Sequence, residues 1–166
     1  MRSGPGTVIT ERVREKFKRF SETGRVFFMG AACGFGKSTV AEELLSGKRV
    51  KRISFPEGDI SSVTTGGWDF FLADGLHTIQ DRSVSDALVA LIRENPGKKF
   101  VILSRGQVPG YLMPFSYSGI METVGPGTCF LTGRRRRSSC QRAAGYSPRR
   151  TFPHSIRSLW ATLWRL

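Results

Sequence analysis

The stretch from Val26 to Leu45, VFFMGAACGFGKSTVAEELL, constrains the fold of this chain more than any other. A continuous apolar run, typical of a strand buried on both faces of a sheet, leads into a glycine-rich turn and then into helix-forming residues. A loop between a buried strand and a helix N-terminus presents unpaired backbone N–H groups to an anion. The stretch therefore predicts a strand–loop–helix unit that holds phosphate.

The loop fits the pattern G-x-x-x-x-G-K-[ST], with Ala31 in place of the first glycine. A small residue is enough where a strand turns into such a loop, so we interpret Ala31 as a tolerated change. In this pattern Lys37 reaches the β- and γ-phosphates of a nucleotide, and the Ser38 hydroxyl holds Mg²⁺. The predicted nucleotide-binding residues are Ala31, Ala32, Cys33, Gly34, Phe35, Gly36, Lys37, Ser38 and Thr39.

The rest of the first 124 residues alternates between apolar runs and helical patterns. We expect helices over residues 8–20, from residue 38 to a stop at Gly47, and over 83–94, and strands over 25–29, 48–55, 68–74 and 98–104. Thr10 is a candidate N-cap of the first helix, and Ser83 and Asp86 have capping-box spacing in the third. Strands separated by helices predict an α/β fold of the P-loop NTPase type, a doubly wound, mostly parallel sheet with flanking helices.

Two strand ends supply candidate catalytic residues. Asp74 closes a predicted neighbouring strand, where a carboxylate can hold Mg²⁺ directly or through water. Arg105 follows the last predicted strand, emerges with Ser104 at the ligand-binding edge of the sheet, and can sense a γ-phosphate. Ser38 and Asp74 are thus the predicted metal ligands, with ATP and Mg²⁺ as cofactors. The alternatives are that Asp74 only caps a turn and that Arg105 pairs with a loop carboxylate.

Hydrolysis has weaker support than binding. In many ATPases of this class a second acid follows the first and orients the attacking water, but here the next residue is Gly75. We therefore expect a weak ATPase at most. His77 is either a polar sensor in the same crevice or an ordinary loop histidine.

The formal charge of +13 is concentrated at the end of the chain, because residues 126–166 hold nine arginines and no acid. We place a boundary near Val124, between a nucleotide-binding core (1–124) and an irregular basic tail (125–166). The three cysteines, Cys33, Cys129 and Cys140, have no metal-ligand spacing. Without a secretory signal or an apolar run of about 20 residues, we expect a soluble, cytoplasmic protein with no membrane partner.

Three segments, GAACGFGKST, WDFFLADGLHTIQD and FVILSRGQVPGYLMPF, together resemble the N-terminal ATPase domain of large LuxR-related transcriptional regulators of the maltose-activator (MalT-like) type. These belong to the STAND class of signal-transducing NTPases, and the resemblance covers about residues 8–124. It implies an ATP-driven switch in which ATP and an inducer favour self-association, and a C-terminal helix-turn-helix domain then binds promoter DNA. The family commonly has two successive acids where this chain has Asp74 and Gly75.

The tail departs from the family, which continues with an acidic helix where this chain has LTGRRRRSSC. Read one base out of phase, this segment can encode Asp-Arg-Glu and then Glu-Gln-Leu. We hypothesise that residues from about Gly125 onward are frameshifted and that the chain is a truncated regulator without its DNA-binding domain. The encoding DNA would contradict this if its neighbouring frame did not continue as a regulator.

Two other functions stay open. The chain could be a free-standing small P-loop kinase or NTPase that uses the arginine run as a phosphate lid. It could also be a nucleic-acid-binding protein whose tail arginines, Arg134 to Arg137, Arg149 and Arg150, neutralise phosphates without sequence preference.

Overall fold

The computed structural model describes residues 8–63, 66–125 and 131–132. Apart from Gly125, Leu131 and Thr132, the predicted tail lies outside the described residues. The elements are β1 (Val8–Ile9), α1 (Glu11–Glu22), β2 (Val26–Gly30), α2 (Lys37–Leu44), β3 (Val50–Ser54), η1 (Ile60–Ser62), β4 (Phe70–Asp74), η2 (Leu76–Thr78), α3 (Arg82–Glu94), β5 (Lys99–Ser104), η3 (Gly110–Leu112), α4 (Met113–Tyr117), β6 (Met121–Val124) and β7 (Leu131–Thr132).

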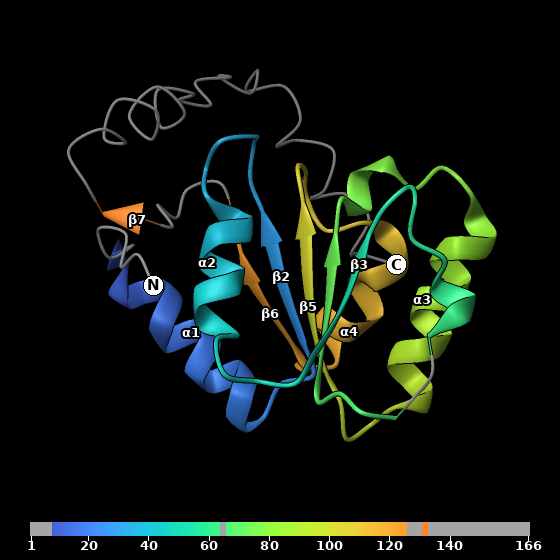
Figure 1. Ribbon diagram of the computed structural model, residues 1–166, viewed down its shortest axis with the longest axis horizontal. Coiled ribbons are helices and arrows are strands. Elements are labelled where there is room, and N and C mark those ends of the chain that lie inside the picture. The colour runs from blue at the N-terminus through green and yellow to red at the C-terminus, as the bar shows by residue number, and fades with distance from the viewer. Residues whose placement is uncertain (1–7, 64–65, 126–130, 133–166) are drawn as a thin grey trace, which may run out of the picture.

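Within the described residues, five strands form one parallel sheet in the order β3-β4-β5-β2-β6. Figure 1 shows all five strands running in the same direction, so that their carboxyl ends share one edge. β2 lies inside the sheet, with Gly30 beside Ser104 of β5 and Met29 beside Val124 of β6. The short strands β1 and β7 pair with each other in an antiparallel ladder.

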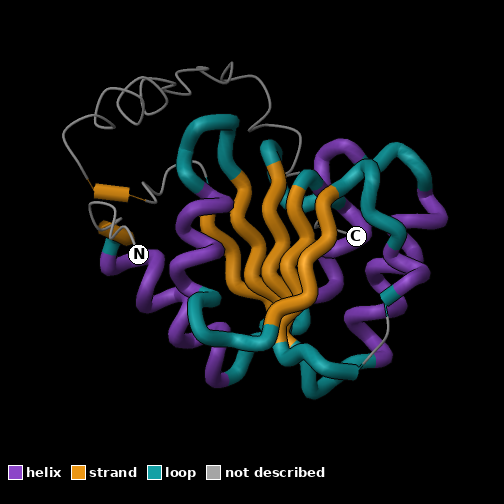
Figure 2. Tube along the Cα trace, in the orientation of Figure 1, coloured by secondary structure: helices purple, strands orange, loops and turns teal. Residues whose placement is uncertain are grey.

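Alternate residues of the central strands face two separate apolar layers. Phe27 and Met29 of β2 point to the layer that α1 and α2 cover, whereas Val26 and Phe28 point to the layer that α3 and α4 cover. Figure 2 shows the sheet between these two groups of helices. The sequence prediction of an α/β fold with a parallel sheet and flanking helices is confirmed, because continuous apolar strands need cover on both faces.

Local details differ from the sequence predictions. The first helix begins at Glu11, after Val8 and Ile9 have paired with β7. The strand expected over 48–55 is limited to Val50–Ser54, and β6 was not predicted at all. The capping box at Ser83 and Asp86 is wrong, since Asp81 is the N-cap of α3 and accepts a hydrogen bond from the Ser83 N–H at 2.8 Å.

None of the helices in the described part of the chain is both long and apolar enough to cross a lipid bilayer.

Candidate functional site

A cavity of about 530 Å³ opens at the edge of the sheet where the strands end. We call it the phosphate cavity. Eight of the predicted site residues line it: Cys33, Gly34, Gly36, Lys37, Ser38, Thr39, Asp74 and Arg105. The sequence alone thus identified segments that the fold brings together from the β2–α2 loop and from the ends of β4 and β5.

Lys37 is the first residue of α2, and its side chain is buried at the base of the β2–α2 loop. Its ammonium group donates hydrogen bonds to the carbonyl oxygens of Ala31, at 2.6 Å, and Ala32, at 2.9 Å. Burial lowers the pKa of Lys37, Asp74 acts in the opposite direction, and Arg105 lowers it further. The loop therefore holds a largely desolvated cation in the position where the sequence pattern expects a phosphate ligand.

The loop itself combines a small buried residue with a left-handed backbone. Ala31 is fully buried in the layer that contains Val40 and Val124, so a small apolar side chain fits there. Gly36 has a φ of +77° and is the N-cap of α2, a conformation that favours glycine. The N-terminus of α2, with the positive end of its dipole, faces the cavity.

Ser38 and Asp74 form the polar pair at the centre of the phosphate cavity. The Ser38 hydroxyl donates to Asp74 Oδ2 at 3.0 Å, and the Gly75 N–H donates to Asp74 Oδ1 at 2.7 Å. The prediction that Asp74 lies on a strand next to β2 is wrong, because β5 lies between β2 and β4. Asp74 nevertheless reaches Ser38 directly across that strand.

The Ser38–Asp74 pair suits a hard cation. A hydroxyl and one carboxylate are oxygen ligands of the kind that Mg²⁺ takes from proteins, with water and phosphate completing the shell. Among the described residues, no group of three or more His, Cys, Asp or Glu side chains is arranged to hold a metal. Ser38 and Asp74 can therefore supply two oxygen ligands to a hard cation.

Gly75 is fixed by its surroundings. Its φ is +77°, and a Cβ atom added there would lie 2.6 Å from the carbonyl oxygen of Phe55. A side chain at this position would need both a strained backbone and a shift of the neighbouring strand end. The backbone conformation at Gly75 therefore disfavours a second acid here, and a change of the side chain alone would not supply one.

The end of β5 separates the loop from Asp74. Ser104 is buried, and its carbonyl oxygen accepts from the Ala31 N–H at 3.2 Å, which ties β5 to the first residue of the loop. Arg105 follows as an exposed residue that lines the cavity. His77, also exposed, lines it from η2.

Some predicted residues contribute only backbone, and some wall residues were missed. Ala31, Ala32 and Phe35 do not line the phosphate cavity, although the first two supply the carbonyl oxygens that hold Lys37. Ser54, Phe55 and Thr78 line it and were not predicted. The signal for Ser54 and Phe55 was present, since both lie at the carboxyl end of a predicted strand.

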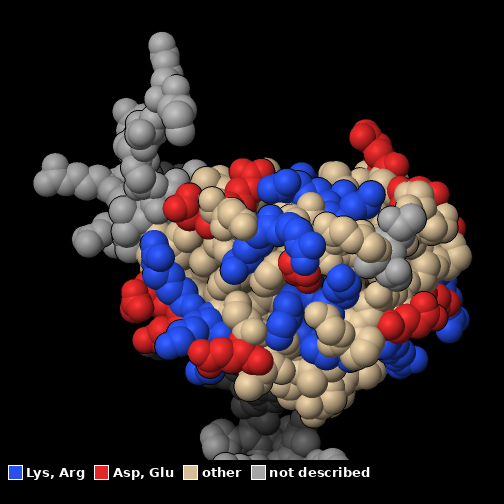
Figure 3. Space-filling model, turned by 60° about the horizontal axis from the view of Figure 1, so that its bottom comes forward, with Lys and Arg blue, Asp and Glu red and all other residues tan. Residues whose placement is uncertain are grey.

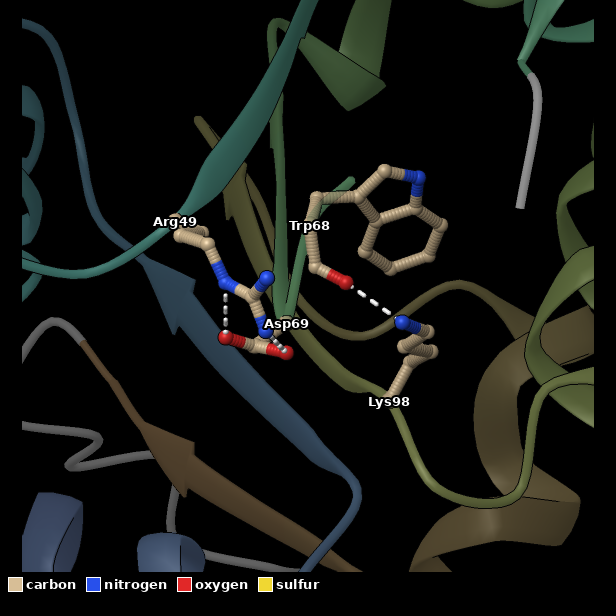
Figure 4. A network of polar contacts seen from close by, with 4 residues as sticks. All are labelled: Arg49, Trp68, Asp69 and Lys98. Carbon is tan, nitrogen blue, oxygen red and sulfur yellow. Dashed lines mark hydrogen bonds and ion pairs between the residues drawn. The ribbon is translucent and has the colours of Figure 1, made fainter. Parts of the chain in front are cut away.

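The opposite edge of the sheet, where the strands begin, is rich in basic residues. Figure 3 shows Lys and Arg gathered on this side with acidic residues among them. Figure 4 shows that Arg49 forms a two-point ion pair with Asp69 and that Lys98 donates to the Trp68 carbonyl oxygen. Lys99 donates to the carbonyl oxygens of Phe20 and Gly24 near the end of α1. These cations hold strand starts and a helix C-terminus in place.

Comparison with known protein families finds no family model that matches the chain, and comparison with curated proteins finds no match either.

Proposed function

We propose that this chain binds ATP with Mg²⁺ as the nucleotide-switch domain of a transcriptional regulator of the maltose-activator type. The observation that carries the proposal is the 3.0 Å hydrogen bond between Ser38 and Asp74 beside the buried Lys37. The three sequence segments that resemble the regulator family supply all the lining residues of one cavity except Ser54 and Phe55. The parallel sheet with helices on both faces supports the proposal, because ligands of such folds bind at the carboxyl ends of the strands.

Each residue has a defined part in nucleotide binding. Lys37 exchanges the carbonyl oxygens of Ala31 and Ala32 for β- and γ-phosphate oxygens, and the N–H groups of the β2–α2 loop surround the phosphates. Ser38 and Asp74 hold Mg²⁺, which supplies charge neutralisation between the phosphates. Arg105 contacts the terminal phosphate and so distinguishes ATP from ADP.

The site is better suited to the slow ATP turnover of a switch than to fast catalysis. Asp74 is the one carboxylate among the described residues that line the phosphate cavity, and it is already bonded to Ser38 and Gly75. A Mg²⁺ ligand that also accepts a backbone hydrogen bond is a poor base for water. On this proposal, bound ATP is therefore hydrolysed slowly, and the ATP-bound state is long-lived.

The direct test is ATP binding by the full chain, measured by calorimetry for the wild type, Lys37→Ala and Lys48→Ala. Because hydrogen bonds to a charged group contribute about 1.5–3 kcal/mol, Lys37→Ala should weaken binding by roughly tenfold or more. Lys48 is an exposed lysine beyond the other end of α2, where its ammonium lies over the Phe70 ring. Lys48→Ala should leave the affinity unchanged, and equal binding by all three proteins would refute the assignment.

A further inference from the structure

We propose that a second cavity, beside the phosphate cavity, binds a small organic cation with an apolar body. This second cavity has a volume of about 420 Å³. It lies between the segment after β3 and the start of α3, and its walls are Phe55, Pro56, Gly58, Thr78, Ile79, Gln80, Asp81 and Val84. The proposal goes beyond nucleotide binding, because it assigns a different ligand to a different set of residues.

The size and lining of the second cavity are those of a ligand site. Small-molecule pockets commonly measure about 300–1,000 Å³ and combine apolar walls with a few polar groups. Here Phe55, Pro56, Ile79 and Val84 provide the apolar walls, and Gln80 and Asp81 provide exposed polar groups at one side. This arrangement fits one ring system of modest size that carries a single polar end.

The charges around the second cavity determine the sign of that polar end. Asp81 is the one charged residue in its described lining, and the hydrogen bond from the Ser83 N–H lowers the pKa of Asp81 and keeps it ionised. Glu57 and Asp59 flank the lining residue Gly58 in the sequence. The nearest cation in the sequence, Arg82, lies 3.7 Å from Asp86 one turn along α3. The N-terminus of α3 adds a partial positive charge here, but the Asp81 carboxylate that caps it carries a full negative charge. The full charges around the cavity therefore favour an ammonium group over an anion.

The second cavity shares a wall with the phosphate cavity. Phe55 and Thr78 line both. The Phe55 N–H donates to the Asp74 carbonyl oxygen at 2.9 Å, and the Thr78 hydroxyl donates to the Gly75 carbonyl oxygen at 2.8 Å. The common wall is therefore hydrogen-bonded to Asp74, which is assigned to Mg²⁺, and to the next residue, Gly75.

The two cavities have opposite polarity. Lys37 and Arg105 supply positive charge to the phosphate cavity, whereas Asp81 supplies negative charge to the second cavity. Phosphate groups and an organic cation are consequently directed to different sides of the wall. A cation bound in the second cavity would contact Phe55, which also lines the phosphate cavity.

The test uses two probes that share an indole ring and differ in charge: tryptamine and indole-3-acetate. Amide spectra of the full chain, recorded during titration, should show saturable shifts at Ile79 and Val84 with tryptamine. Since an exposed ion pair changes affinity only modestly, tryptamine should bind roughly threefold or more tighter than indole-3-acetate. No shifts at these residues, or tighter binding of the acid, would overturn the proposal.

Matched variants separate binding in the cavity from general effects. Val84→Arg fills the second cavity and should abolish the shifts at Ile79, whereas Ala90→Arg, at an exposed position of the same helix, should leave them unchanged. Asp81→Asn keeps a residue suited to the N-cap but removes the charge that lines the cavity, so it should reduce the preference for tryptamine. Tryptamine binding that survives in Val84→Arg, or an undiminished preference in Asp81→Asn, would contradict the assignment.

Loss of ATP binding and loss of tryptamine binding can be measured separately, so failure of the proposed function is distinguishable from failure of this proposal. Lys37→Ala should lose ATP affinity and keep its affinity for tryptamine, because Lys37 lies outside the second cavity. Saturating ATP should not displace tryptamine from the wild type. Competitive displacement would show that the second cavity belongs to the nucleotide site, and would overturn the proposal of a separate ligand.

Discussion

At the scale of single residues, Gly75 shows why the chemistry of this site depends on backbone geometry. The position after the first carboxylate is where many P-loop ATPases carry a second acid, but Gly75 has a φ of +77° and lies against the Phe55 carbonyl oxygen. A Cβ atom would meet backbone, which cannot rotate away as a side chain can. The close approach of the segment after β3 to the end of β4 therefore explains why the residue after Asp74 is a glycine and not an acid.

Replacement of Gly75 tests this directly. Gly75→Ala should lower the free energy of unfolding by about 1–3 kcal/mol, through left-handed strain and the close contact with Phe55. Gly97→Ala is the matched control, since a Cβ atom there meets nothing within 4 Å. Its effect should stay within about 0.5 kcal/mol in the same urea titration. If Gly75→Ala were as stable as the wild type, the backbone at this position would accept a side chain and would not explain the absence of a second acid.

Most of the polar residues that line the phosphate cavity could be found from the sequence, but the backbone constraints beside them could not. Lys37, Ser38 and Asp74 were predicted because each residue type has one task at a strand end or helix start. The restriction on Gly75 was not predicted, because it comes from a carbonyl group at the end of a different strand.

At the scale of elements, apolar periodicity predicted the strands that are buried on both faces and failed for β6. Met121–Val124 has four residues, and only the first and last are buried, so it has neither a continuous run nor a strict alternation. The start of α3 was misplaced for another reason. Asp81 and Ser83 can both cap a helix, and only the observed hydrogen bond from the Ser83 N–H to Asp81 decides between them.

The cap of α3 gives a pH-dependent prediction. Asp81→Ala should lower the urea midpoint relative to the wild type at neutral pH, because the Ser83 N–H loses its acceptor. The folded-state pKa of Asp81 is depressed below the ordinary value of 3.8, so this stabilisation is present above that value and is lost as the pH falls through the folded-state pKa.

The measurement is a series of urea titrations of the wild type, Asp81→Ala and Asp86→Ala from neutral to acidic pH. The wild type and Asp81→Ala should converge in the acidic range. Asp86 forms only an exposed ion pair with Arg82, so Asp86→Ala should have the smaller effect at neutral pH. An effect of Asp86→Ala that exceeded that of Asp81→Ala would restore the capping box that the structure excludes.

At the scale of the whole molecule, the two edges of the sheet differ in the surroundings of their cations. Cations at the amino edge bind the protein's own oxygen atoms, as the Arg49–Asp69 pair illustrates. At the carboxyl edge, Lys37 also binds backbone oxygen atoms, those of Ala31 and Ala32, but it lines a cavity that is large enough for a ligand, together with Arg105. The position of β5 between β2 and β4 follows from strand order, which local sequence patterns do not fix.

On the proposed function, Ser38 and Asp74, which come from opposite sides of β5, act together on the metal of a bound nucleotide. The most direct measurement is the increase in ATP affinity on adding Mg²⁺, determined for the wild type, Ser38→Ala, Asp74→Asn and the double variant. We predict an increase of about tenfold or more in the wild type, a much smaller one in either single variant, and little further loss in the double variant. The same Mg²⁺ dependence in all four proteins would show that Ser38 and Asp74 do not hold the metal.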